Sequence, residues 1–156
     1  MLSRLVFTIL MISLNLYSAT LSPWGSAKLM DTQYKPQKVI YDVDYGSLEK
    51  LTNILDRISY LKKLYKSDPF ESSIIVVLHG DSIPYFAKEN TEKNLRFLKR
   101  AYDLTLDGVI EFRMCKAAAL LRHYTHKDIH GFIQMVPMAD AEIIRLQKEE
   151  SYSYMR

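Results

Sequence analysis

The feature that most constrains the fold is the alternation of short apolar runs with amphipathic helical segments between residues 38 and 156. Continuous apolar runs, above all residues 73–78, are typical of strands that are covered on both faces. Apolar residues spaced three and four apart indicate helices. Strands that alternate with helices through short connections form parallel βαβ units with right-handed crossovers. The sequence therefore predicts an α/β fold, built as a three-layer α/β/α sandwich around a mostly parallel sheet.

The expected elements follow one another closely along the chain. Ser47 is the expected N-cap of the first helix, because its side chain can accept from free N–H groups of the first turn. Gly108 is placed as a C-terminal cap of the second helix. The strands are expected at residues 39–43, 73–78, 109–114, 132–136 and 152–155, and the helices at residues 47–68, around 95–108, from 116 onward and at 140–150.

The N-terminus has the layout of a secretory signal peptide: Arg4, an uncharged apolar run at residues 5–17, and small residues at 18–20. The run is shorter than the roughly 20 apolar residues of a membrane-spanning helix, which disfavours an uncleaved anchor. We expect a signal peptide at residues 1–19, cut within residues 18–22, an N-terminal arm at 20–37 and one domain at 38–156. The mature protein would be periplasmic or secreted, without stable membrane insertion.

Charge and motif content exclude several functions. The formal net charge is +3 and becomes +2 without Arg4, and the basic residues lie at helical spacing among acidic ones, so we expect no nucleic-acid partner. The glycines form neither a dinucleotide fingerprint nor a phosphate-binding loop, and no Gly-x-Ser-x-Gly motif is present. A single cysteine allows no internal disulfide and no dithiol. We therefore expect no cofactor.

Candidate site residues follow the expected strands, at the carboxyl edge where open α/β sheets bind ligands. Asp42 and Asp44 belong to the end of the first strand, His79 follows the second, and Cys115 follows the third. The two aspartates are not expected to act as a carboxylate pair.

Cys115 is the main candidate for a reactive group. A thiol in the first turn of a helix lies near the positive end of the helix dipole, and Arg113 and Lys116 add positive charge, so the thiolate should be favoured. The alternative is a small buried cysteine that only packs.

The histidines have simpler alternatives. His79 can be an ordinary polar side chain at a loop edge, and it lies close to Cys115 only if the second and third strands are neighbours. His123, His126 and His130 could hold a metal, but the spacing crosses a helix end and lacks an acidic or cysteine ligand, so a solvated turn and no metal site are expected. Tyr152 and Tyr154 are expected in the core or an interface.

Four segments together resemble the DsrE/DsrF-like sulfur-relay family. They are residues 112–122 (FRMCKAAALLR), 76–80 (VVLHG), 135–138 (MVPM) and 144–154 (IRLQKEESYSY). The resemblance covers residues 38–156 and implies a five-stranded sheet with the last strand antiparallel, assembly into trimers or hexamers, and persulfide transfer through Cys115. The leader and Ser151, where the family often has glycine, depart from the pattern.

The leading hypothesis is a sulfur carrier outside the cytoplasm. Cys115 would hold a persulfide received from a donor protein or a small sulfane-sulfur compound and pass it to an acceptor. His79 would be an auxiliary group, and Asp44, Arg113 and Lys116 would contribute to binding. The half-polar third strand and the short last strand also predict a homo-oligomer. The alternatives are a non-catalytic oligomeric accessory protein with a structural Cys115, and a small metal or haem binder.

Overall fold

The computed structural model describes residues 24–156, so the expected signal peptide and the cleavage region lie outside the described residues. Residues 24–37 form neither a helix nor a strand. Residues 33–156 form one compact unit, which contains every candidate site residue. Within residues 24–156, no helix is both long enough and apolar enough to cross a membrane.

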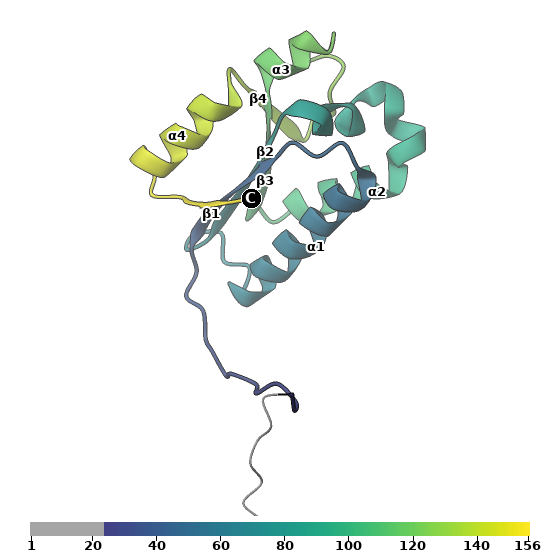
Figure 1. The fold of residues 1–156 in the computed structure, drawn as a ribbon. Coiled ribbons are helices and arrows are strands. Elements are labelled where there is room, and N and C mark those ends of the chain that lie inside the picture. Colours follow the sequence, from purple (N-terminus) through teal and green to yellow (C-terminus); the bar gives the residue numbers. More distant parts are fainter. Residues whose placement is uncertain (1–23) are drawn as a thin grey trace, which may run out of the picture. The chain divides into compact units, whose positions relative to one another are not determined.

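Strands and helices alternate along this unit as the sequence predicts (Figure 1). Two short 3₁₀ helices between the second strand and the second α-helix were not expected. The elements are β1 (Lys38–Val43), α1 (Leu48–Leu64), β2 (Ser73–Leu78), η1 (Gly80–Phe86), η2 (Lys88–Asn90), α2 (Thr91–Thr105), β3 (Ile110–Cys115), α3 (Lys116–Leu121), β4 (Ile133–Val136), α4 (Ala139–Glu149) and β5 (Ser153–Met155).

The five strands form one sheet in the order β4-β3-β2-β1-β5, and every pairing is parallel. The α/β class is therefore confirmed. The expected antiparallel last strand is wrong, because β5 pairs in parallel with β1, with Tyr154 opposite Ile40. The reason is the path of α4: it carries the chain back along the sheet, so the next strand starts from the same edge as the others. Ser151, in the left-handed region with a φ of 61°, reverses the chain before β5.

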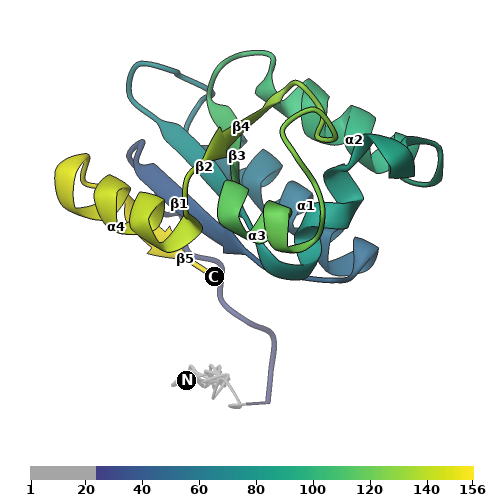
Figure 2. The ribbon, with the colours of Figure 1, turned by 90° about the horizontal axis from the view of Figure 1, so that it is seen from above.

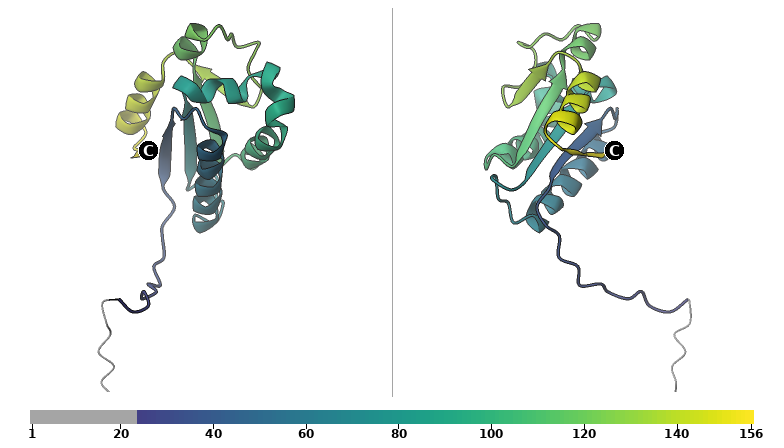
Figure 3. Two further views of the ribbon diagram at one scale, coloured as in Figure 1. Left: turned by 45° about the vertical axis from the view of Figure 1, so that its right-hand side comes forward. Right: turned by 90° about the vertical axis from the view of Figure 1, so that its left-hand side faces the viewer.

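Helices cover both faces of the sheet. Helices α1 and α2 pack on one face, and α4 packs on the other against β1 and β2 (Figures 2 and 3). Successive side chains of a strand point to opposite faces. Tyr41 and Val43 therefore face α1, whereas Ile40 faces α4. Asp42, two residues after Ile40, lies on the α4 face.

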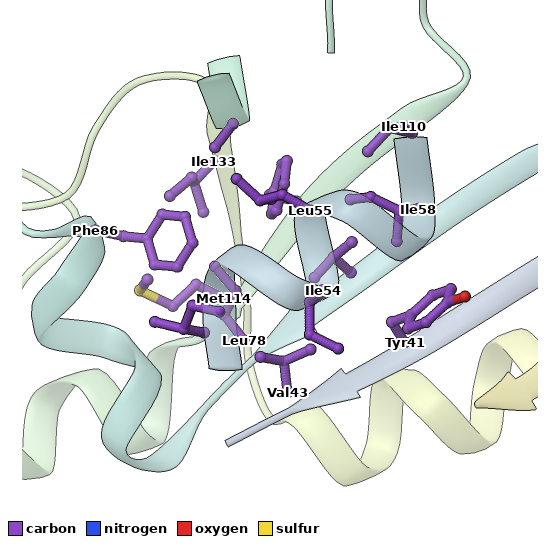
Figure 4. Close-up of a cluster of buried hydrophobic side chains, with 14 of the residues drawn as sticks. Tyr41, Val43, Ile54, Leu55, Ile58, Leu78, Phe86, Ile110, Met114 and Ile133 are labelled. Atoms are coloured by element: carbon purple, nitrogen blue, oxygen red, sulfur yellow. The ribbon is translucent and has the colours of Figure 1, made fainter. Parts of the chain in front are cut away.

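The larger core fills the space between the sheet and helices α1 and α2. Ile54, Leu55 and Ile58 of α1 recur at helical spacing and are almost completely buried against strand side chains such as Val43 and Leu78 (Figure 4). Each such side chain contributes roughly 1.5–3 kcal/mol through removal of apolar surface from water.

The expected N-cap of α1 is confirmed, whereas the expected C-terminal cap of α2 at Gly108 is wrong, because α2 ends at Thr105 and its C-cap is Leu106. Ser47 caps α1 by accepting a hydrogen bond from the N–H of Lys50 at 3.5 Å. Gly108, with a φ of 77°, follows the end of α2 in a conformation that L side chains rarely adopt. Ser47 fixes where the loop after β1 ends, and Gly108 lies in the turn between α2 and β3.

Candidate functional site

The connections after β3 and β4 leave the sheet in opposite directions. From β3 the chain enters α3, whose Ala119 belongs to the core shared with α1 and α2. From β4 the chain enters α4, on the opposite face. Neighbouring strands whose connections diverge leave a crevice at their carboxyl ends, and ligands of open α/β sheets bind there. Cys115, paired with Val136 of β4, occupies this point.

Cys115 is both the last residue of β3 and the N-cap of α3. Its backbone is extended (φ −65°, ψ 110°), and its Sγ accepts a hydrogen bond from the N–H of Ala118 at 3.4 Å. The side chain packs in the cluster that contains Ala139 and Ile143 of α4, and only 5% of the residue is exposed. An N–H donor directed at sulfur stabilises a negative charge there. The same packing limits access to the sulfur.

A chain of hydrogen bonds crosses three strands at the same edge. His79 Nε2 lies 2.7 Å from Asp42 Oδ1, and the Tyr154 hydroxyl donates to Asp42 Oδ2 at 2.7 Å. The three side chains come from the ends of β2, β1 and β5. The side chains of Asp42 and His79 are about one-quarter exposed, at 20% and 27%. Polar groups thus converge at the carboxyl edge on the α4 face.

His79 and Cys115 follow neighbouring strands. Leu78 pairs with Met114, so the next position of each strand holds His79 and Cys115. Cys115 belongs to the α4 face, and so does His79, which lies two residues beyond Val77. The structure shows no hydrogen bond between the two side chains. A neutral imidazole that binds a carboxylate through Nε2 carries its proton on Nε2, so the basic nitrogen of His79 is Nδ1.

Arg113, Lys116 and Asp44 do not bind Cys115. Arg113 Nε binds Glu111 Oε1 at 2.7 Å, and its Nη1 binds Glu142 of α4, so carboxylates neutralise its charge. The exposed Lys116 lines a hollow of about 310 Å³ on the outside of α3. Asp44 faces the guanidinium of Arg156 at 3.9 Å.

Of the three histidines after α3, His130 contacts two other side chains. His130 Nε2 lies 3.0 Å from the hydroxyl of Thr91, and its ring stacks on Phe132. Burial, followed by the positive charge of Lys88, lowers the pKa of His130. Residues 24–156 contain no group of three or more histidine, cysteine or acidic side chains that could hold a metal ion.

Sequence reasoning placed Asp42 at the carboxyl edge without giving it a role, and it did not place Tyr154 in the site. The signal for Asp42 was its position two residues after Ile40, which places it on the face of Cys115. Tyr154 could not be found in this way, because its contact with Asp42 depends on β5 lying parallel beside β1.

No protein-family model matches the sequence, and no curated protein matches it closely enough to show a relationship. The fold resembles a solved structure, that of the protein of unknown function MTH1491 from Methanobacterium thermoautotrophicum. The similarity covers 77% of this chain and 98% of that one, with a TM-score of 0.57 and 16% sequence identity. At this identity the likeness shows that the chain shares the α/β fold of that protein.

Proposed function

We propose that this protein carries sulfane sulfur on Cys115. The observation that carries the proposal is the position of the sulfur: Sγ accepts the N–H of Ala118 at the point where the connections after β3 and β4 diverge. A donor N–H favours the thiolate, and it favours the persulfide anion that would follow. The resemblance of residues 112–122 to the sulfur-relay family supports the same chemistry.

The transfer has two balanced steps. The Cys115 thiolate attacks the outer sulfur of a polysulfide or of thiosulfate, an S–S bond forms, and the shortened polysulfide or sulfite leaves with the electron pair of the broken bond. An acceptor thiolate then attacks the outer sulfur of the persulfide, and the Cys115 thiolate leaves. Nδ1 of His79 takes the proton of Cys115 before the first step, directly or through one water.

The wider setting of this function rests on the sequence. The N-terminal residues support transfer in the periplasm or outside the cell, and the family resemblance supports a trimer or hexamer. Donor and acceptor would then be exported proteins or small sulfane-sulfur compounds.

Intact-mass measurement tests the carrier role. The reduced protein, incubated with polysulfide, should gain the mass of one or more sulfur atoms, and a reductant should remove them. Cys115→Ser should abolish the gain and keep the circular dichroism of the parent. Wild-type protein that gains no sulfur under conditions that load a small thiol contradicts the proposal.

A second candidate is a non-catalytic accessory protein in which Cys115 only packs. The burial of Cys115 beside Ala139 and Ile143 favours it. The two candidates differ in thiol accessibility: a structural cysteine reacts with iodoacetamide only after the protein is unfolded, whereas a carrier cysteine reacts in the native state.

A further inference from the structure

The chain turns sharply at the single residue that follows the proposed base. His79 is extended, with a φ of −153° and a ψ of −173°. Gly80, where η1 begins, has a φ of 54°, in the left-handed region that residues other than glycine rarely adopt. The conformation of Gly80 therefore determines how the chain leaves His79.

Gly80 also lies against Asp44, the residue that follows β1. A Cβ on Gly80 would lie 3.2 Å from the Cβ of Asp44 and 3.5 Å from its carbonyl oxygen. The N–H of Asp81 donates to that carbonyl oxygen at 3.2 Å. The contact between the two Cβ atoms would be shorter than ordinary van der Waals contact, so a side chain at position 80 would push the turn and Asp44 apart by a few tenths of an ångström. Both the backbone conformation and the available space favour glycine here.

Further hydrogen bonds hold the turn on β1 from both sides of Gly80. The N–H of His79 donates to the carbonyl oxygen of Val43 at 3.0 Å. Ser82 is completely buried, and its hydroxyl lies 2.7 Å from the carbonyl oxygen of His79 and 3.1 Å from that of Val43. Because the turn is anchored on both sides, a displacement at Gly80 also displaces His79.

The imidazole of His79 depends on this placement. Its Nε2 lies 2.7 Å from Asp42 Oδ1, and a hydrogen bond of this kind weakens once the separation exceeds about 3.2 Å. Asp42 precedes Asp44 by two residues, so a turn that moves away from Asp44 also moves His79 away from Asp42.

We infer that Gly80 is a positioning residue, whose missing side chain lets the turn approach Asp44. This approach holds the imidazole of His79 on Asp42. The consequence for Cys115 rests on the proposed function, in which His79 is the base.

Gly80→Ala tests the inference with two measurements. In its crystal structure, His79 Nε2 and Asp42 Oδ1 should lie more than about 3.2 Å apart. The rate at which iodoacetamide labels Cys115 should fall about tenfold at neutral pH, which is part of the effect of losing a general base. At about pH 10, where an ordinary thiol loses its proton without a base, the rate should match wild type.

Gly108→Ala is the matched control. Gly108 has a φ of 77°, so alanine meets backbone strain there too, but no other part of the chain lies within 4 Å of the added Cβ. Gly108 precedes β3 and so lies at the sheet edge opposite to Cys115. Gly108→Ala should therefore leave the labelling rate unchanged at both pH values.

Two further variants separate the contact from the strain. Gly80→Asn carries the same Cβ, but asparagine adopts the left-handed conformation more readily than alanine, so this variant remains informative if Gly80→Ala does not fold. It should show the same displacement of His79 and the same loss of rate. Gly80→Ala combined with Asp44→Gly removes the Cβ that the alanine meets, and it should restore the bond between His79 and Asp42.

An unchanged separation of His79 Nε2 and Asp42 Oδ1 in both variants at position 80 would overturn the inference. So would a rate that falls equally at neutral pH and at about pH 10, or equally in Gly108→Ala, because general destabilisation would then explain it. A lengthened bond with an unchanged rate would support the placement by Gly80 and would instead refute His79 as the base. Sulfur uptake by the wild-type protein is measured separately, so the proposed function and this inference can fail independently.

Discussion

The carboxylate of Asp42 on β1 holds the imidazole of His79 after β2, with Oδ1 and Nε2 2.7 Å apart. The second oxygen of the same carboxylate accepts from Tyr154 of β5. One carboxylate therefore connects the central strands with the edge strand and fixes the proton of His79 on Nε2. This relationship makes the C-terminal strand part of the candidate site.

Tyr154→Phe should destabilise the fold by about 0.5–1.5 kcal/mol, because it removes one hydrogen bond. The cost stays modest because the Asp42 carboxylate is partly exposed and can bind water instead. Urea unfolding followed by circular dichroism measures the change. Tyr60→Phe is the matched control, since Tyr60 is 66% exposed on α1. Equal stability of both variants would show that the bond to Asp42 contributes nothing measurable.

Asp42→Asn should slow the reaction of Cys115 at neutral pH, because it weakens the group that orients His79. His79→Gln should slow it by about 100-fold if His79 is the base, in the range typical of general bases. The rate of iodoacetamide labelling, followed by intact mass, gives the comparison. Asp44→Asn removes a neighbouring carboxylate that does not bind His79 and should leave the rate unchanged. A rate unaffected by either substitution would remove His79 from the proposed chemistry.

Native Cys115 should discriminate between thiol reagents by size. Only 5% of the residue is exposed, so a small reagent such as methyl methanethiosulfonate should reach Sγ much faster than the bulky aromatic disulfide DTNB. In urea the two reagents should approach the rate ratio that they show with a free thiol. A native ratio equal to the unfolded one would mean that the thiol is open to solvent.

Glu142 should contribute to acid sensitivity. Its hydrogen bond from Arg145 lowers its pKa despite partial burial, and Arg113 adds to the effect. A carboxyl group with a lowered folded-state pKa adds stability above its unfolded-state pKa, and this stability is lost as the pH falls through the folded-state value. Glu142→Gln should therefore be less stable than wild type at neutral pH, where Arg113 and Arg145 lose their partner, and should lose less stability on acidification.

Urea midpoints at neutral pH and at about pH 3 check this expectation. Glu149→Gln, an exposed position on the same helix, is the control and should follow wild type at both values. Parallel loss of stability in wild type and Glu142→Gln on acidification would show that Glu142 is not a source of the acid dependence.

Local patterns determined much of this structure. The β-branched run at residues 73–78 could be buried only as a central strand, and the structure has it as β2 with both neighbours in place. The order of strands and helices implied a parallel sheet and so placed Cys115 at its carboxyl edge. Such features depend on the spacing of apolar residues that are neighbours along the chain, and this spacing can be read from the sequence.

Three features depended on the tertiary structure alone. The direction of β5 followed from the course of α4. Arg113 forms an ion pair with Glu142 of α4, which is distant in the sequence. Asp42 forms hydrogen bonds with His79, which follows β2, and with Tyr154 of β5. The sequence by itself determined which residues are strands, helices and core, because hydrophobic periodicity acts within a few residues. Only the folded sheet decided which polar side chains meet, because contacts between distant segments are set by the packing of the whole domain.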